Sequence, residues 1–524
     1  MGVGAVASEK IYAGYAHLLD PNRKWYNNWR LIRLNAWIVL FLITSSTNGY
    51  DGSMMNGLQS LDQWENAFNK PSGSMLGLLN AIQNIGALAA YPFAPYLSDG
   101  IGRRPTVFVG AAIMIGATAL QTASQTVNMF IGARFMIGFG LTFATNSAPM
   151  LVSEISYPPY RAALTSVYNS LWYSGAIIAA WSTYGTFKIP TSWAWRVPSL
   201  LQGLPSVIQV ALVWFAPESP RYLVSKGKEA QALRTLAYYH ADGNEQDPLV
   251  QYEFEEIKAA IDLDRHVNAN VGWKSLVTKK GNLKRLRIVV AIAFFSQWSG
   301  NGLVSYYLNK VFDSIGITDP TTQLLINGIL QIWNLAIAIM ASFFVERLGR
   351  RLLFLTSCIG MLVFFTLQTA CAGVFANTGS DQAAHAVIAF IFLYYASYDL
   401  AFTPLIVSYT IEIVPYNIRA KTFNVFNFTI SLALIFNQYV NPIALDAIGW
   451  KYYVVYCCWI LVELVFCYFY VVETKGRSLE ETAALFDGEE AVDQVAGAAR
   501  DVHDNHLTDD KASGTSYQIP EKTV

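Results

Sequence analysis

The chain has 524 residues, of which 53% are hydrophobic and 14% are charged. Soluble domains carry about 25% charged residues, so this composition excludes an ordinary soluble protein and indicates an integral membrane protein. The 36 Lys and Arg residues nearly balance the 37 Asp and Glu residues, which excludes bulk electrostatic attraction to nucleic acid.

Twelve apolar runs are long enough to cross a bilayer. An α-helix needs about 20 apolar residues for this, and backbone groups in lipid must be hydrogen-bonded within the segment, so we predict helix for every run. The runs cover residues 35–57, 73–97, 106–125, 128–152, 162–186, 195–216, 288–312, 321–345, 352–376, 384–410, 420–443 and 449–472. This pattern predicts an all-α membrane protein with twelve transmembrane helices in two groups of six.

The remaining segments complete the predicted organisation. Residues 1–34 precede a six-helix bundle at 35–216, and a charged linker at 217–287 leads to a second bundle at 288–472. Amphipathic patterns in the linker predict short helices on the inner membrane surface. The tail at 473–524 is predicted to be largely disordered, because after Asp487 it is polar and has no apolar period.

Positive charge marks one side of the predicted bundle. Lys and Arg concentrate in the linker and in the loops after the second, fourth, eighth and tenth runs. Positively charged loops stay in the cytoplasm, so we place both termini and the linker there. These loops hold Arg103, Arg104, Arg161, Arg347, Arg350, Arg351 and Arg419.

The two groups of runs also repeat each other. SDGIGRRP at 98–105 matches VERLGRRL at 345–352, EISYPPYRA at 154–162 matches EIVPYNIRA at 412–420, and PESPR at 217–221 is echoed by VETKG at 472–476. Many secondary transporters are duplicated six-helix units of this kind, with the substrate site between the halves near the midplane.

One carboxylate lies inside the first apolar run, in the motif GYDG at 49–52. An ionisable side chain at membrane depth is functional by default, although Asp51 at a wet helix end is the alternative. Arg134, at the start of the fourth run, is the other candidate buried charge of this half. If the two face each other, the ion pair keeps the carboxylate ionised until a proton neutralises it and changes which conformation is favoured.

Together these motifs resemble the sugar porter family of the major facilitator superfamily over residues 30 to 485. QWSGNGLVSYYL at 297–308 and FNQYVNPIAL at 436–445 resemble fungal lactose permease-like and cellodextrin transporters. The resemblance implies that Asp51 and Arg134 are the proton-coupling pair. It also implies a cytoplasmic gate formed by Arg103, Arg104, Glu154, Arg161, Glu346, Arg350, Arg351, Glu412 and Arg419. The alternative role for these charges is to determine the topology alone.

Sugar recognition needs amides that pair with hydroxyl groups and aromatic rings that contact the C–H faces. By resemblance, Asn169 replaces a sugar-binding glutamine, Gln297 keeps the second of a glutamine pair, and Asn334 keeps a binding asparagine. Tyr306 and Tyr307 match the aromatic pair that closes the outer gate. An interhelical hydrogen bond is the alternative role for each amide. The predicted substrate-binding residues are Asn169, Gln297, Trp298, Asn301, Asn334, Phe402 and Asn427.

Four positions carry shorter side chains than the family has there: Ser296, Gly302, Ala176 and Val407. We expect these to enlarge the pocket and to favour a disaccharide.

The sequence contains neither a nucleotide-binding loop nor a His/Glu metal pattern, so we predict no enzyme activity and no cofactor. We predict a monomeric, proton-coupled sugar importer of the plasma membrane that works by alternating access on a disaccharide such as lactose or cellobiose. A pentose or hexose carrier, with or without proton coupling, is one alternative. A sugar-sensing transporter homologue is the other.

Overall fold

The computed structural model describes residues 18–19, 23–270, 273–475 and 485–486. The expected disorder of the tail concerns residues outside this part. The described elements are helices, without a strand among them. The first half contains α2 (Trp29–Leu58), α3 (Asp62–Ala67), α4 (Gly73–Ala90), α5 (Ala94–Ile101), α6 (Arg103–Thr122), α7 (Val127–Ile155), α8 (Pro158–Thr186), α9 (Trp193–Leu201), α10 (Leu204–Leu212) and the 3-10 helix η3 (Val213–Phe215). The second half contains α15 (Lys280–Trp298), α16 (Asn301–Asp313), α17 (Pro320–Leu348), α18 (Arg350–Thr378), α19 (Asp381–Ile413), α20 (Tyr416–Ile448), the 3-10 helix η4 (Gly449–Lys451) and α21 (Tyr452–Tyr470).

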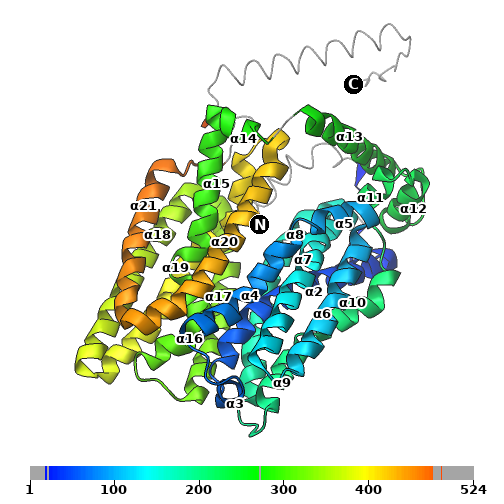
Figure 1. Cartoon of the computed structure of the whole chain (residues 1–524). Coiled ribbons are helices and arrows are strands. Elements are labelled where there is room, and N and C mark those ends of the chain that lie inside the picture. The colour runs from blue at the N-terminus through cyan, green and yellow to red at the C-terminus, as the bar shows by residue number, and fades with distance from the viewer. Residues whose placement is uncertain (1–17, 20–22, 271–272, 476–484, 487–524) are drawn as a thin grey trace, which may run out of the picture.

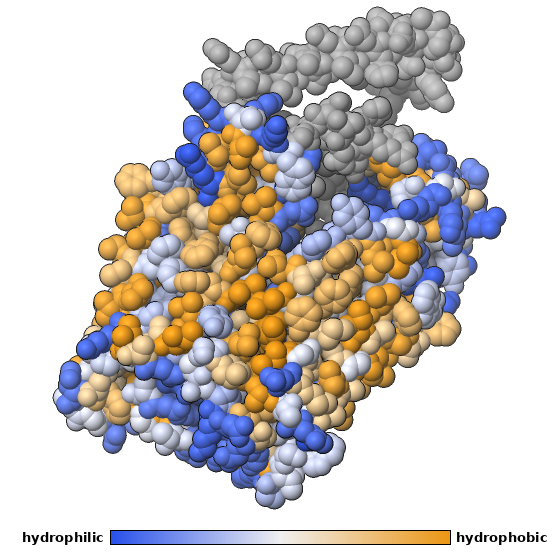
Figure 2. All heavy atoms as spheres, viewed as in Figure 1, coloured by the Kyte–Doolittle hydropathy of each residue, from blue (hydrophilic) through white to orange (hydrophobic). Residues whose placement is uncertain are grey.

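The twelve predicted spans correspond to these helices. Three spans consist of two helices each, namely α4 with α5, α9 with α10, and α15 with α16; the others are α2, α6, α7, α8, α17, α18, α19, α20 and α21. By length and composition alone, nine stretches of the described chain could cross a membrane, with α20 and α21 merged into one. Figure 2 shows hydrophobic residues across the middle of the visible face and hydrophilic residues at its two ends, as a bilayer requires.

The broken spans occur where the chain cannot continue a regular helix. Pro95 and Pro205 lie in the first turns of α5 and α10, and Gly300 separates α15 from α16 with a φ of 96°. Proline cannot donate a backbone hydrogen bond, and only glycine adopts this φ without strain. Broken helices at membrane depth are tolerated where the break is buried in protein or lines a water-filled cavity. Gln202 and Asn301 lie directly at two of these breaks.

The two halves lie side by side (Figure 1) and contact each other mainly through α2 with α16, α4 with α20, and α8 with α17. Within the first half, α2 and α8 approach to backbone contact. A Cβ atom on Gly49 would lie 1.8 Å from the Trp172 carbonyl oxygen, and one on Gly175 would lie 1.8 Å from the Ser46 carbonyl oxygen. Such small-residue contacts are how membrane helices pack closely, and they hold the part of α2 that carries Asp51 directly against α8.

The linker folds into α11 (Pro220–Ser225), α12 (Glu229–His240), α13 (Pro248–Asn270) and α14 (Ser275–Thr278), at one end of the bundle (Figure 1). Buried His240 attaches it to the first half. Its Nδ1 lies 2.7 Å from the Glu253 carboxylate and its Nε2 lies 3.2 Å from the carbonyl oxygen of Ile155 in α7. Arg161 of α8 also approaches Glu253, at 3.5 Å.

Candidate functional site

Asp51 and Arg134 face each other inside the first half. The Asp51 side chain is 0% exposed and that of Arg134 is 2% exposed, with 3.6 Å between Arg134 Nη1 and Asp51 Oδ1. Arg134 also donates to the Leu79 carbonyl oxygen at 2.9 Å and to Gln83 Oε1 at 2.7 Å. The predicted pairing of Asp51 with Arg134 is therefore present. Two opposite charges fully removed from water are stable only as a pair.

Gln202 is a third member of this cluster that sequence reasoning missed. Its side-chain amide donates to Asp51 Oδ1 at 2.5 Å, and it lies at the break between α9 and α10. The other carboxylate oxygen, Oδ2, is buried and has no hydrogen-bond partner in the described part of the chain. A proton can therefore bind at Oδ2 without displacing Gln202. The signal in the sequence was an amide in an apolar run just before Gly203 and Pro205.

The halves are joined by hydrogen bonds at the end of the bundle that the charge pattern places outside. Asn56 of α2 accepts from the Leu308 backbone amide at 3.0 Å and donates to the Val304 carbonyl oxygen at 3.3 Å. Gln59 donates to the Tyr306 carbonyl oxygen at 2.9 Å, and Asn309 donates to the Gln59 carbonyl oxygen at 3.1 Å. These four hydrogen bonds close this end of the bundle, and together they are called the outer closure.

The predicted outer-gate tyrosines lie in this closed region. Tyr307 is fully buried at a kink in α16, with φ −138° and ψ 32°. Its hydroxyl donates to the Gln438 carbonyl oxygen, while the Gln438 side chain accepts from Asn84 of the other half at 2.6 Å. Tyr306 is partly exposed. The contacts are consistent with a gate, and that role stays a prediction.

Three predicted sugar-binding residues cluster at the break between α15 and α16. Gln297 donates to Ser296 Oγ at 3.0 Å, and Asn301 donates to the Ser296 carbonyl oxygen at 3.0 Å. Asn301 Oδ1 is buried without a hydrogen-bond partner among the described residues. Trp298 packs edge-on against Trp459 of α21, with ring centroids 4.7 Å apart. Trp298 is therefore embedded largely among other aromatic rings.

The remaining predicted binding residues are dispersed. Asn334 of α17 is buried, and its Oδ1 has no partner in the described chain. Phe402 of α19 is buried and stacks on Tyr398 at 5.5 Å. Asn427 of α20 is partly exposed. The side chain of Asn169 lies outside the described residues.

The expected enlargement of the pocket is wrong at Gly302. A Cβ atom there would lie 1.9 Å from Asn437 Nδ2, because the Asn437 side chain already fills that space. Ser296 and Ala176 are fully buried, and only Val407 of the four short side chains is partly exposed. Three of the four positions therefore add no accessible space.

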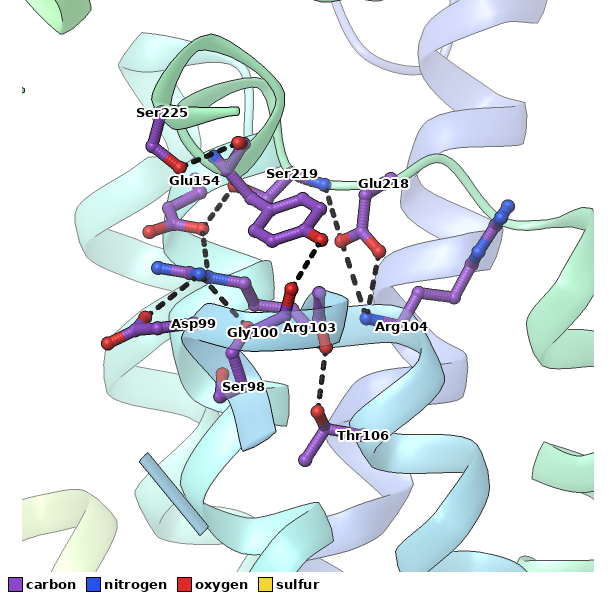
Figure 3. Close-up of polar contacts among 12 residues, drawn as sticks. Ser98, Asp99, Gly100, Arg103, Arg104, Thr106, Glu154, Glu218, Ser219 and Ser225 are labelled. Carbon is purple, nitrogen blue, oxygen red and sulfur yellow. Dashed lines mark hydrogen bonds and ion pairs between the residues drawn. The ribbon is translucent and has the colours of Figure 1, made fainter. Parts of the chain in front are cut away.

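The cytoplasmic charges of the first half form the network in Figure 3. Arg103 pairs with Glu154 of α7 at 3.2 Å and with Asp99 at 3.1 Å. Ser219 donates its hydroxyl to Glu154. Glu218 accepts the backbone N–H of Arg104 at 3.3 Å, at the start of α6. The network joins α5, α6, α7 and the beginning of the linker.

The second half repeats this network with equivalent residues. Arg350 pairs with Glu412 of α19 at 2.9 Å, and Thr474 donates its hydroxyl to Glu412 at 2.5 Å. Glu473 accepts the backbone N–H groups of Arg350 at 2.9 Å and Arg351 at 3.0 Å. Burial raises the pKa of Glu473, but these N–H groups and the Arg350 charge outweigh burial and hold it below its usual value. The echoed motifs are thus the same structural device.

Three of the predicted gate arginines donate to carbonyl oxygens of their own half. Arg351 donates to the Tyr468 carbonyl oxygen at 2.8 Å, Arg104 to the Ala216 carbonyl oxygen at 2.9 Å, and Arg419 to the Val414 carbonyl oxygen at 3.3 Å. The Glu346 side chain lies outside the described residues. These contacts brace each half, and a role in closing the cytoplasmic side stays a prediction.

Two further buried acids escaped sequence reasoning. Asp399 of α19 and Glu463 of α21 are both 0% exposed. Glu463 accepts from Ser299 Oγ at 2.9 Å, at the α15–α16 break. The signal that identified Asp51, an acid within an apolar run, was present at both positions.

Comparisons with known proteins agree with this architecture. The family described as "Sugar (and other) transporter" matches residues 37–486. A high-affinity glucose transporter of Kluyveromyces lactis is 27% identical over 476 residues, covering 85% of this chain and 84% of the relative. A probable quinate permease of Aspergillus niger is 27% identical over 504 residues, covering 89% of each chain.

Solved structures share the fold. The inward-open xylose transporter XylE of E. coli superposes with a TM-score of 0.71 at 22% identity, covering 86% of this chain and 100% of that one. XylE described as a proton:xylose symporter bound to 6-bromo-6-deoxy-D-glucose gives a TM-score of 0.66 over the same shares. The predicted family and twelve-helix fold are therefore confirmed: the chain is a multi-pass membrane protein that belongs to the sugar transporter family of the major facilitator superfamily.

Proposed function

We propose that the protein is a proton-coupled sugar importer of the plasma membrane, with both termini in the cytoplasm, that works by alternating access. The observation that carries the proposal is the fully buried pair of Asp51 and Arg134, with one carboxylate oxygen held by Gln202 and the other open to a proton. The XylE structure described as a proton:xylose symporter supports it.

The pair is placed to link protonation to the contact between the halves. Asp51 and Asn56 lie on the same helix, α2, and Asn56 bonds directly to α16 of the other half. When a proton neutralises Asp51, the attraction to Arg134 is lost, while Arg134 keeps its bonds to Leu79 and Gln83. The charge state of α2 therefore changes beside the outer closure, and this is the differential interaction that a conformational shift requires.

The proton gradient supplies enough free energy for accumulation. One charge moving through 100 mV yields about 2.3 kcal/mol, which corresponds to about 50-fold accumulation at 1.4 kcal/mol per factor of ten. A one-to-one symporter could therefore concentrate sugar substantially.

A monosaccharide is favoured over a disaccharide. The space expected at Gly302 is filled by Asn437, and Ser296 and Ala176 are sealed in the interior. The glucose transporter among the relatives and the xylose transporter among the solved structures support a pentose or hexose. The disaccharide stays a prediction with less support.

Uptake of labelled sugars by transport-deficient yeast tests the proposal. The wild type should accumulate a pentose or hexose against its gradient, and a protonophore should abolish the accumulation. Asp51→Asn should lose uphill uptake but retain exchange, while Asp62→Asn, at an exposed acid on α3, serves as the matched control. Protonophore-insensitive uptake by the wild type would identify a facilitator, and uphill uptake by Asp51→Asn would remove Asp51 from the mechanism.

A further inference from the structure

Asp399 forms a polar contact between the halves inside the membrane-spanning region. Its Oδ1 accepts the Tyr173 hydroxyl from α8 of the first half at 2.6 Å, and the Thr403 hydroxyl of its own helix at 2.5 Å. The residue lies near the middle of α19, and Tyr173 lies near the middle of α8. Alternating access changes how the two halves contact each other, so this hydrogen bond belongs to the surface that must rearrange.

The two oxygens of Asp399 have different surroundings. Oδ1 has two hydroxyl donors at the distances typical of charge-assisted O–H···O⁻ bonds, about 2.5–2.7 Å. Oδ2 is buried and has no hydrogen-bond partner among the residues that the structure describes. A buried polar atom left without a partner is costly, and in a carboxylate it is also the position where a proton can bind.

Charge compensation distinguishes this carboxyl group from Asp51. Asp51 has Arg134, whereas no ion pair to Asp399 occurs within the described residues. The titratable groups that act on or lie around Asp399 are tyrosines: Tyr173 of α8 and, on α19, Tyr395 and Tyr398. Tyr306 of α16 and Glu463 of α21 act electrostatically on Tyr398. An ionised Asp399 is therefore stabilised by hydroxyl dipoles without a cation, and one proton removes its buried charge.

We propose that Asp399 is a second proton-binding site, and that its protonation weakens the hydrogen bond to Tyr173 and thereby loosens the contact between the halves. A proton from solvent forms an O–H bond at Oδ2, and the carboxylate becomes a neutral acid. Oδ1 then accepts from Tyr173 as a carbonyl oxygen. Charge-assisted hydrogen bonds are about twice as strong as neutral ones, so the neutral form holds α8 and α19 less tightly. The effect on transport rests on the proposed alternating-access function, whereas proton binding itself does not.

Infrared difference spectroscopy of the purified full-length protein tests proton binding without a known substrate. Spectra recorded across a pH series should contain a protonated-carboxyl C=O band that is lost in Asp399→Asn. Tyr173→Phe should keep this band but shift it to higher frequency, because the C=O group loses a donor. Glu463→Gln, which alters a buried acid bonded within the second half, is the control and should keep it. Identical difference spectra for the wild type, Asp399→Asn and Tyr173→Phe would overturn the proposal.

Exchange of the sugar identified by uptake then tests the effect on the halves. The wild-type exchange rate should rise as pH falls. Asp399→Asn and Tyr173→Phe should each show a smaller rise, because only Asp51 then remains to couple proton binding to exchange. Wild-type pH dependence in both variants would overturn the proposed loosening. Asp51→Asn separates the two ideas: it should lose uphill accumulation yet keep the Asp399 band. A wild type without uphill accumulation would refute proton coupling through Asp51, while loss of the band in Asp399→Asn would still support the second site.

Discussion

Substituting Gly349 with Ala should destabilise the second half by about 3–5 kcal/mol, through backbone strain and loss of hydrogen bonds. Gly349 precedes α18 with φ 90° and ψ 163°, a region that costs other residues about 1–3 kcal/mol. The new Cβ would lie 2.7 Å from Glu473 Oε2. Glu473 would have to move away from the N–H groups of Arg350 and Arg351, and each lost bond costs about 1 kcal/mol.

Thermal denaturation of the detergent-purified protein measures this loss, with the monodisperse fraction followed by size-exclusion chromatography. Gly379→Ala is the matched control. Gly379 has a φ of 65° but no heavy atom within 4 Å of a new Cβ, so it should lose only the left-handed strain of about 1–2 kcal/mol. Gly102→Ala should resemble Gly349→Ala, because its Cβ would lie 2.5 Å from Glu218 Oε2. A Gly349→Ala protein that melts at or above the Gly379→Ala temperature would refute the reasoning.

Three further substitutions test the outer closure and the repeated network. Asn56→Ala removes hydrogen bonds between α2 and α16. Each such bond is worth about 0.6 kcal/mol in membranes, so the outward-facing population should rise about 3- to 8-fold. Labelling of a cysteine introduced at the outer end measures this population, and unchanged labelling would show that Asn56 does not hold this end closed. Because the pKa of Glu473 is held below its usual 4.5, its contribution to stability is present above that pH and lost as pH falls through the lower folded-state value. Glu473→Gln should therefore lower the melting temperature at neutral pH and reduce the further loss in acid. Burial raises the pKa of Glu218, against the lowering effect of backbone N–H groups. The ionisation of Glu218 therefore opposes stability as pH rises. At neutral pH, Glu218→Gln should lower the melting temperature less than Glu473→Gln does. Equal losses for the two variants would contradict this assignment.

The positions of the spans were predictable because the bilayer imposes a simple rule on composition. About twenty apolar residues must be helical to cross it, so the spans could be read from the sequence. Their interruptions were less evident. Pro205 and Gly300 break helices at points that place Gln202 and Asn301, and an apolar run of the right length gives little sign of such a break.

The candidate site also has a part that could be predicted from the sequence and a part that could not. Asp51 could be singled out because a charge in an apolar run has few explanations, and the same rule applied without exception would have found Asp399 and Glu463. The cavity argument failed at Gly302 because a missing side chain leaves space only if no neighbour fills it. Asn437, 135 positions away along the chain, fills it here.

Composition, run length and repeated motifs by themselves determined the twelve-helix fold and the family, since these depend on the solvent and on residues close together along the chain. Which side chains meet was decided only by the tertiary structure. The bond from Tyr173 to Asp399 and the closure from Asn56 to Leu308 join residues more than two hundred positions apart, and such contacts depend on how the two halves pack against each other.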